Sequence, residues 1–181
     1  VKDGVAILTV DNPPVNPLSD GVRAGFVNNI DKAENDPDVL GVVLTGAGRS
    51  FIAGADISEF GKNPDGPGLD EAFKKLEFCS KPVVAAINGS ALGGGLETAL
   101  VCNYRIAGPA AFVGLPEVNL GLLPGAGGTQ RLPRLVGPAE ALKMMLTGMH
   151  VNAKKALSMG IIDEVSDDLI NDSIKFIQKV S

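Results

Sequence analysis

Two kinds of hydrophobic pattern take turns along the chain. Short continuous apolar runs rich in β-branched residues are typical of strands, and Val5–Val10 and Val83–Ile87 have this composition. Apolar residues three or four positions apart are typical of helices that bury one face, and this spacing begins at Asp20 and again at Leu69. Because strands and helices alternate, the pattern predicts a single α/β domain with parallel strands over residues 1–181.

The same two patterns predict the remaining elements and leave two long loops between them. The loops, residues 46–68 and 115–128, are rich in glycine and proline, and loops of this kind often carry ligand sites. Within the first loop, residues 62–68 are expected to be mobile. Further strands are expected at residues 40–45, Tyr104–Ala107, 111–114 and 161–165, and further helices at residues 69–80, 93–100, 129–135, 139–146, Ala153–Met159 and Leu169–Val180.

The charge and the residue counts limit the partners of the chain. A formal net charge of -5 argues against nucleic acid or an anionic membrane surface, because both select for basic patches. No apolar run reaches the roughly 18 residues of a membrane helix, so a soluble, intracellular protein without membrane insertion is expected. Two cysteines without a CxxC spacing and the single His150 leave too few ligands for zinc, so no metal is expected.

Three consecutive glycines, residues 93–95, open the helix that contains Glu97. Glycine lets backbone N–H groups at the start of a helix approach a negatively charged oxygen, which makes Gly94 a candidate donor to an oxyanion. Close packing of the helix on a strand would require the same residues, and the spacing alone does not distinguish the two uses. The run lacks the GxGxxG pattern of a dinucleotide-binding fingerprint.

Two glutamates with apolar neighbours are candidates for acid–base chemistry. Glu97 follows Leu96 in the expected helix, where burial would raise the pKa of its carboxyl toward the range of a general base. It could instead serve only to bind N–H groups of the helix. Glu117 follows Pro116 in the second loop, where a glutamate is more often solvated than catalytic. These residues alone leave both uses open for each glutamate.

The other polar residues give weaker evidence for a functional site. His150 and the serines do not form a nucleophile set, since the sequence has no GxSxG elbow and only one histidine. Arg131 and Arg134 could neutralise a phosphate, although charged residues on a helix usually form its solvated face.

Four motifs follow one another along nearly the whole chain. They are residues 54–57 (GADI), 81–89 (KPVVAAING), 91–97 (ALGGGLE), and 115–117 (LPE) running into 124–132 (PGAGGTQRL). In this order they resemble the crotonase superfamily, also called the enoyl-CoA hydratase/isomerase superfamily. The NPPVN turn at residues 12–16 and the GGLE variant are similar to the N-terminal hydratase/isomerase part of multifunctional fatty-acid β-oxidation proteins.

This resemblance implies a crotonase spiral of ββα units with flanking helices, and a specific site within it. The amides of Ala55 and Gly94 would surround the thioester oxygen of an acyl-CoA, and Glu97 and Glu117 would lie on either side of one water. The residues implied for binding of CoA and substrate are Ala53, in the family's adenine-binding turn, and Asp56 and Ile57, on the loop beside it.

The implied activity is hydration of 2-enoyl-CoA to 3-hydroxyacyl-CoA in fatty-acid β-oxidation, because family members with both glutamates are typically hydratases. Δ3-Δ2-enoyl-CoA isomerisation, alone or as a second activity, and a non-catalytic acyl-CoA-binding or assembly role are the alternatives. No separate cofactor is expected, since CoA is carried by the substrate. A homo-oligomer (trimer or hexamer) or a place in a larger multifunctional chain is also implied.

Two expectations concern the protein as a whole. Members of this superfamily usually continue beyond the position where residue 181 stands, with C-terminal helices that help close the acyl pocket, and these helices are expected to be missing from residues 1–181. The implied compartment is the cytoplasm in a bacterium and the peroxisome or mitochondrion in a eukaryote.

Overall fold

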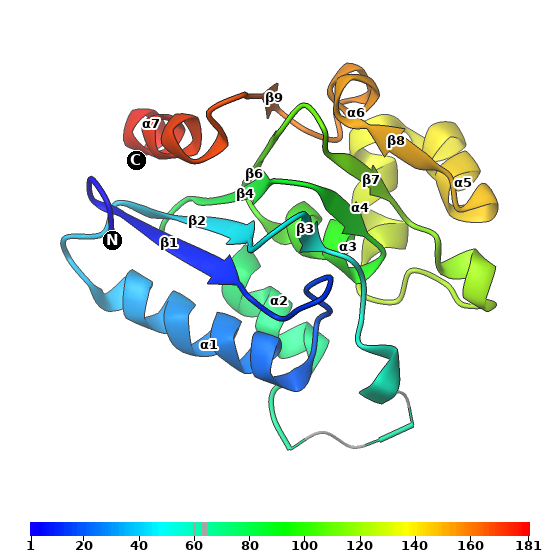
Figure 1. Cartoon of the computed structure of the whole chain (residues 1–181), viewed down its shortest axis with the longest axis horizontal. Coiled ribbons are helices and arrows are strands. Elements are labelled where there is room, and N and C mark those ends of the chain that lie inside the picture. Colours follow the sequence, from blue (N-terminus) through cyan, green and yellow to red (C-terminus); the bar gives the residue numbers. More distant parts are fainter. Residues whose placement is uncertain (60, 63–64) are drawn as a thin grey trace.

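A computed structural model describes residues 1–59, 61–62 and 65–181. Its strands form two sheets (Figure 1). The larger sheet is parallel throughout and has the order β1-β2-β4-β6-β9. The smaller sheet has the order β3-β5-β7-β8, and β8 pairs antiparallel with β7. The bounds are β1 Val5–Val10, β2 Gly41–Gly46, β3 Ser50–Ile52, β4 Val83–Ile87, β5 Ser90–Leu92, β6 Tyr104–Ala107, β7 Phe112–Gly114, β8 His150–Asn152 and β9 Glu164–Val165.

A strand of the larger sheet repeatedly leads into a strand of the smaller one. β2 is followed by β3, β4 by β5 and β6 by β7, and the helices α2, α3 and α4 come after these three pairs. Because β2, β4 and β6 are neighbours in one sheet and β3, β5 and β7 in the other, the chain winds as a spiral of ββα units. This arrangement confirms the α/β fold class and the parallel pairing predicted from the sequence.

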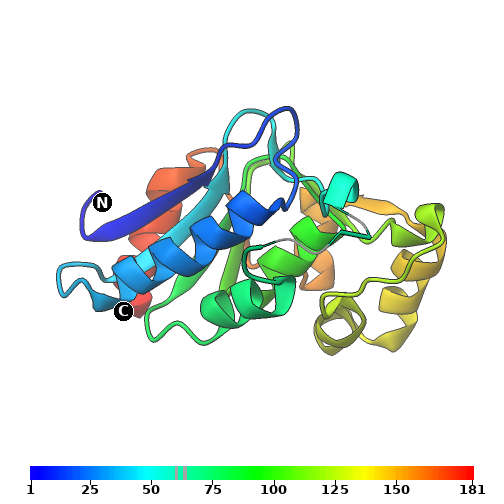
Figure 2. The ribbon, with the colours of Figure 1, turned by 90° about the horizontal axis from the view of Figure 1, so that it is seen from below.

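Helices cover both faces of the larger sheet, with α1 and α7 on opposite sides (Figure 2). Val43 of β2 packs in one cluster with Ile177 of α7, while Val42 packs in the main core with Phe26 of α1. Both faces of β2 are therefore buried, which explains the three consecutive apolar residues 42–44 at its centre. The helices are α1 Asp20–Asn35, α2 Leu69–Glu77, α3 Gly94–Val101, α4 Gly128–Val136, α5 Pro138–Thr147, α6 Ala153–Met159 and α7 Leu169–Val180, and the 3-10 turns are η1 Ile57–Glu59 and η2 Glu117–Leu120.

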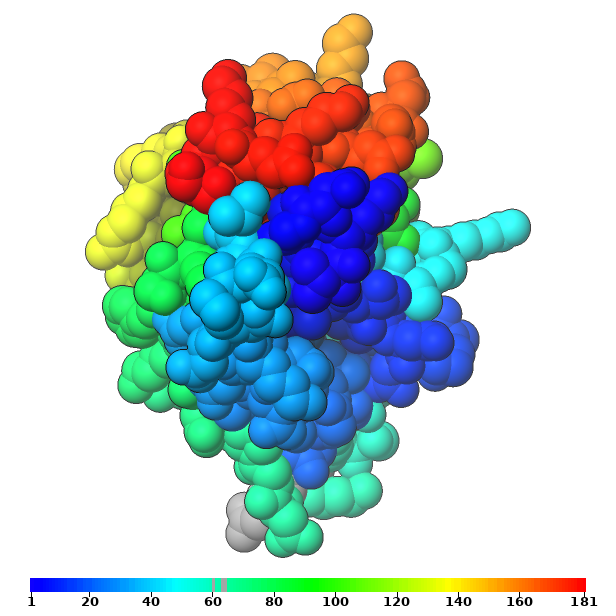
Figure 3. Space-filling model, turned by 90° about the vertical axis from the view of Figure 1, so that its left-hand side faces the viewer, coloured from blue at the N-terminus to red at the C-terminus, as the bar shows by residue number. Residues whose placement is uncertain are grey.

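The last helix lies against the first residues of the chain (Figure 3). Lys2 Nζ donates a hydrogen bond of 2.7 Å to Asn171 Oδ1, and Gln178 Nε2 donates one of 2.9 Å to the carbonyl of Asp3. A bilayer crossing would need a longer and more apolar helix than any that the described residues form.

Some predicted elements differ from the structure. The strands β3, β5 and β8 were not predicted, because three residues rarely show a periodicity, although β7 of the same length was expected at residues 111–114. The strand predicted at residues 161–165 is reduced to Glu164–Val165, since Ile161 and Ile162 are buried in the core outside the ladder. The helix predicted over residues 69–80 ends at Glu77. The predicted mobile segment 62–68 lies partly outside the described residues.

Candidate active site

The helix α3 forms the base of the site, and all eight of its residues are buried. A Cβ atom on Gly95 would overlap the carbonyl oxygen of Ile52, so this glycine is required for close packing of α3 on β3. Gly93 has a φ of 53°, which glycine adopts without strain. The triple glycine therefore serves packing at Gly95 and a tight turn at Gly93, which leaves the amide of Gly94 at the open start of the helix.

A second backbone amide lies beside Gly94. A Cβ atom on Gly94 would come within 3.4 Å of the backbone nitrogen of Ala55. Ala55 follows Gly54, whose φ of 117° turns the chain just before this amide. Among the described residues, the Ala55 amide donates no backbone hydrogen bond. Each of the two predicted oxyanion donors thus follows a glycine of positive φ, and both lie at one cavity.

Glu97 is held by backbone amides of the second glycine-rich segment. Its side chain is almost fully buried, at 3% exposure, and Oε1 accepts hydrogen bonds from Ala126 N at 2.9 Å and Gly128 N at 2.8 Å. Burial raises the pKa of the Glu97 carboxyl, while these two N–H donors and the charge of Arg131 oppose the rise. The carboxylate is fixed in position, as a group that holds and activates a ligand must be.

Glu117 belongs to the turn η2, and its side chain lies next to Gly93 at the start of α3. A Cβ atom on Gly93 would come within 3.1 Å of Glu117 Oε1. Its other oxygen, Oε2, is buried and has no hydrogen-bond partner in the described part of the chain. Burial, and then the charge of Glu97, raise the pKa of Glu117 to about 7. At neutral pH this carboxyl can therefore both give and take a proton.

These groups face one cavity of about 310 Å³. The structure places six of the seven predicted site residues in its wall: Ala53, Ala55, Ile57, Gly94, Glu97 and Glu117. Asp56 is the exception, because it does not line the cavity and its carboxylate accepts a hydrogen bond of 3.0 Å from Ser58 N. Hydrogen bonding with the side chain and then the backbone of Ser58 lowers the pKa of Asp56, and the residue stands just before the turn η1.

The apolar part of the wall was not predicted. Three of its leucines lie in or just after η2, and Leu120 and Leu123 are exposed at 66% and 79%. Leucines gathered in a loop without strand or helix periodicity were the available signal, since exposed apolar groups often mark a ligand site. The unpredicted wall residues are Gly54, Leu69, Leu92, Gly93, Pro116, Leu120, Leu122, Leu123, Gly125 and Ala126.

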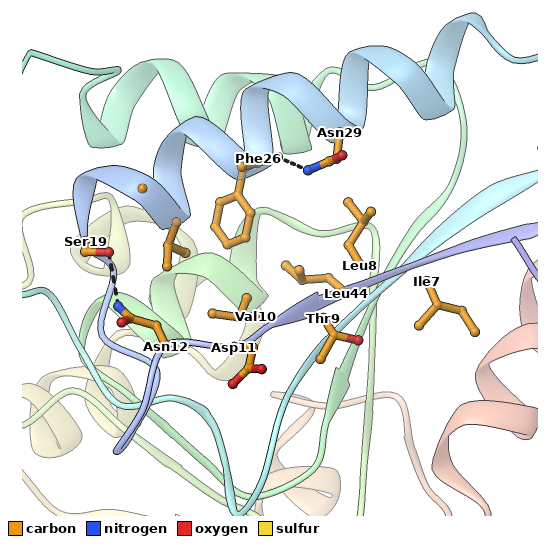
Figure 4. A pocket seen from close by; sticks show the side chains of 13 residues that line it. Ile7, Leu8, Thr9, Val10, Asp11, Asn12, Ser19, Phe26, Asn29 and Leu44 are labelled. Atoms are coloured by element: carbon orange, nitrogen blue, oxygen red, sulfur yellow. Dashed lines mark hydrogen bonds between the residues drawn. The ribbon is translucent and has the colours of Figure 1, made fainter.

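A larger hollow lies elsewhere, between β1 and α1 (Figure 4). Its volume is about 430 Å³, and its lining holds one charged residue, Asp11, among the described residues. Asn12 donates a hydrogen bond of 3.1 Å to Ser19 Oγ at its edge. It brings together none of the predicted site residues, so the smaller cavity with paired carboxyl groups is the better candidate.

The other polar candidates have local partners. The ring of His150 stacks on Phe112, with 5.6 Å between the ring centroids. Arg131 forms an ion pair with Glu77, and the exposed Arg134 donates to Gln130 on its own helix. The structure thus brings neither arginine to the cavity that holds Glu97 and Glu117.

A buried and a half-buried carboxyl group and two backbone amides lie at one apolar cavity. These are the groups expected of an enzyme that combines acid–base catalysis with stabilisation of an oxyanion. The spiral of ββα units narrows the class further. The chain belongs to the enoyl-CoA hydratase/isomerase family, whose sequence model matches residues 1–181.

Individual relatives agree with this membership. The chain is 52% identical over 167 residues to a peroxisomal bifunctional enzyme of Danio rerio, an alignment that covers 92% of the chain and 23% of that protein. It is 46% identical over 169 residues to a probable enoyl-CoA hydratase of Bacillus subtilis, with 90% and 66% covered. A crystal structure of an enoyl-CoA hydratase from Bacillus anthracis has a TM-score of 0.89 and 34% identity, and covers 98% of this chain and 72% of that one.

The chain therefore spans only part of its relatives. It covers 23% of the bifunctional enzyme of Danio rerio and 25% of the one from Cavia porcellus.

Proposed function

We propose that this chain hydrates 2-enoyl-CoA thioesters to 3-hydroxyacyl-CoA. The observation that carries the proposal is that Glu97 and Glu117 face one cavity beside the amides of Ala55 and Gly94. Hydration of an enoyl thioester needs two things. One is a pair of groups that bind water and transfer its protons, and the other is a set of hydrogen-bond donors that stabilise the negative charge on the thioester oxygen. The name enoyl-CoA hydratase carried by relatives in two Bacillus species supports the same reaction.

The amides of Ala55 and Gly94 are assigned to the thioester oxygen. When water attacks the β-carbon, electrons of the double bond move toward the carbonyl and negative charge gathers on that oxygen. Two preorganised N–H donors stabilise this charge without any need to reorganise. Loss of one such donor typically costs a factor of about 100 to 1,000 in rate.

The two carboxyl groups are assigned to the water. Glu97, fixed by Ala126 and Gly128, holds and activates it, and Glu117 exchanges protons with the water and with the α-carbon. The water oxygen bonds to the β-carbon and a proton ends on the α-carbon, so the product has gained one water and both carboxyl groups return to their starting state. A carboxyl with a pKa of about 7 suits such exchange near neutral pH.

CoA is proposed to enter as part of the substrate, with no separate cofactor. Ala53 and Ile57 line the cavity on the side of the loop, and we assign them to substrate binding. The apolar wall formed by Leu120, Leu122 and Leu123 suits an acyl chain, since apolar surface lowers the free energy of binding such a group.

Double-bond isomerisation is a second candidate. It is favoured by the same Glu117, whose pKa is about 7 and whose Oε2 has no hydrogen-bond partner among the described residues. Such a carboxyl can remove a proton from one carbon and return it to another. Conversion of a 3-enoyl-CoA to the 2-enoyl-CoA would test it, and absence of that product would exclude it.

The setting proposed for this reaction is fatty-acid β-oxidation. Relatives from Danio rerio and Arabidopsis thaliana are named as a peroxisomal bifunctional enzyme and a peroxisomal fatty acid β-oxidation multifunctional protein. A place in a multifunctional chain and a peroxisomal location are therefore proposals for this protein, and a homo-oligomer is proposed from the family resemblance alone.

The direct test is to incubate the protein with crotonyl-CoA and to identify the product by chromatography and mass spectrometry. Formation of 3-hydroxybutyryl-CoA by the parent protein, lost in Glu97→Gln, is the expected result. CoA binding measured by calorimetry in the same preparations separates the alternatives. Binding of CoA without turnover of any enoyl-CoA by the parent would favour a non-catalytic acyl-CoA-binding or assembly role and contradict the proposal.

A further inference from the structure

An ion pair joins α2 to α4 beside the proposed active site. Arg131 Nη2 lies 2.7 Å from Glu77 Oε2, and Arg131 Nε donates a hydrogen bond of 3.1 Å to Glu77 Oε1. The two side chains are 27% and 35% exposed, so the pair is partly shielded from water. Two parallel N–H donors to one carboxylate fix the plane of the guanidinium as well as its position.

The third nitrogen of Arg131 reaches the segment that holds Glu97. Nη1 donates a hydrogen bond of 3.3 Å to the carbonyl oxygen of Ala126, whose own amide donates to Glu97 Oε1. A Cβ atom on the next residue, Gly127, would overlap Arg131 Nη1. The backbone at Ala126 and Gly127 is thus shaped around the guanidinium on one side and around the Glu97 carboxylate on the other.

The charge of Arg131 also reaches Glu97. Burial raises the pKa of Glu97, and the positive charge of Arg131 acts with the amides of Gly128 and Ala126 to lower it. Glu117, whose own pKa is raised by Glu97, lines the same cavity. Arg131 does not line the cavity that holds both glutamates, so it acts from behind the backbone and leaves room for a ligand.

We propose that Arg131 and Glu77 are positioning residues for Glu97, with Glu77 orienting Arg131 and Arg131 fixing the Ala126–Gly128 amides that hold the Glu97 carboxylate. This inference rests on the proposed role of Glu97 in hydration. Neither residue lines the substrate cavity. Together they set the position of a group that does, and the charge of Arg131 also favours the ionised form of that group.

The variants that test this inference are Arg131→Gln, Arg131→Lys and Glu77→Gln. The matched control is Arg134→Gln, which makes the same change one turn later on α4, at an exposed arginine that donates to Gln130 of its own helix. Thermal unfolding of each variant gives the folded fraction, so kcat can be expressed per folded molecule.

Arg131→Gln is expected to lower kcat for crotonyl-CoA by about 10-fold to 100-fold, because displacement of a catalytic group by about 1 Å can cost a factor of about 100. KM is expected to change less than kcat, since Arg131 does not line the cavity. The acid limb of the pH profile should move to higher pH, because the positive charge that lowers the pKa of Glu97 is gone.

The other variants separate charge from geometry. Arg131→Lys keeps the positive charge but loses the paired N–H donors of the guanidinium. The acid limb of its pH profile should therefore stay near that of the parent while kcat falls. Glu77→Gln leaves the Arg131 charge in place, so kcat should fall without an upward shift of the limb. If the Glu77–Arg131 pair only stabilised the fold, these variants would have a lower melting temperature but an unchanged kcat per folded molecule and an unchanged acid limb.

The inference is overturned if Arg131→Gln keeps the kcat and acid limb of the parent while Glu97→Gln is inactive. A parent protein that hydrates no enoyl-CoA would contradict the proposed function instead. In that case, NMR titration of 13C-labelled glutamate carboxyl groups still decides, because the Glu97 signal should titrate at higher pH in Arg131→Gln than in Arg134→Gln. Equal titration of Glu97 in these two variants would overturn the inference.

Discussion

The backbone amide of Gly128 lies 2.8 Å from Oε1 of Glu97, so the first residue of α4 donates to a carboxylate in the first turn of α3. The partial positive charge at the start of a helix favours an anion at this place. Two helices that are separated by the 26 residues 102–127 thus meet at one buried side chain, and the shape of Gly128 decides how closely they can approach.

Gly128→Ala should displace Glu97. A Cβ atom at this position would lie 2.9 Å from Glu97 Oε1 and 3.1 Å from Leu115 Cδ1, closer than ordinary contacts. We expect kcat for hydration to fall by about 10-fold or more, and stability to fall by about 1–3 kcal/mol from overpacking. Steady-state kinetics with crotonyl-CoA, corrected for the folded fraction, checks this, and an unchanged kcat would mean that Gly128 does not set the position of Glu97.

Gly25→Ala should act in the opposite direction on stability. Gly25 lies inside α1, and a Cβ atom there would meet nothing within 4 Å. Alanine is favoured over glycine in a helix interior by about 1 kcal/mol, so the free energy of unfolding should rise by about that amount. Urea denaturation measures it, and hydration should stay at the rate of the parent.

The conformation of Gly54 should matter for the Ala55 amide. At Gly54 a Cβ atom would find only ordinary contact, with Leu92 O at 3.7 Å, but the φ of 117° is one that alanine rarely adopts. Gly54→Ala should therefore turn the amide and lower kcat by a factor of about 100. Gly48→Ala is the matched control, since its φ is 69°, nothing lies within 4 Å and it is outside the cavity wall. Equal losses of kcat in both variants would contradict this role for Gly54.

The stability difference between the parent and Glu117→Gln should depend on pH. The pKa of Glu117 is raised from 4.5 to about 7 in the folded protein, so the unfolded chain releases this proton first. The unfolded state binds fewer protons between these values, and the parent loses stability there as pH rises, whereas glutamine does not titrate. Urea denaturation at pH 4.5 and pH 8 should show the glutamine variant gaining relative to the parent at the higher pH. A difference that is the same at both values would contradict the raised pKa.

Elements with a clear local pattern could be predicted from the sequence, whereas most of the three-residue strands could not. The bounds of β1, β4, β6, α6 and α7 match their predictions, because each shows enough residues for a continuous apolar run or a helical period. The strands β3, β5 and β8 have three residues each, and their place in the smaller sheet comes from the pairing of distant segments. No local pattern records that pairing.

The site was predicted through its motifs and not through its chemistry alone. The residues around Glu97 and Glu117 did not show whether either glutamate is catalytic. Neither the 3% exposure of Glu97 nor its hydrogen bonds from the amides of Ala126 and Gly128 can be derived from neighbouring residues in the sequence. The resemblance of four motifs placed six residues at the cavity, while Asp56 faces its own turn. The link from Glu77 to Arg131 joins positions 54 residues apart, which only the folded chain brings together.

The most direct test of the central claim, that Glu97 and Glu117 act on one water, is a double-mutant cycle on crotonyl-CoA hydration. Rates of the parent, Glu97→Gln, Glu117→Gln and the double variant would be followed by loss of the conjugated enoyl absorbance. We expect each single change to lower kcat by a factor of about 100 or more. The kcat of the double variant should be only slightly below that of the less active single variant, because the effects of residues that act as a unit are not additive. Hydration at the parent rate by either single variant, or losses that multiply in the double variant, would contradict the claim.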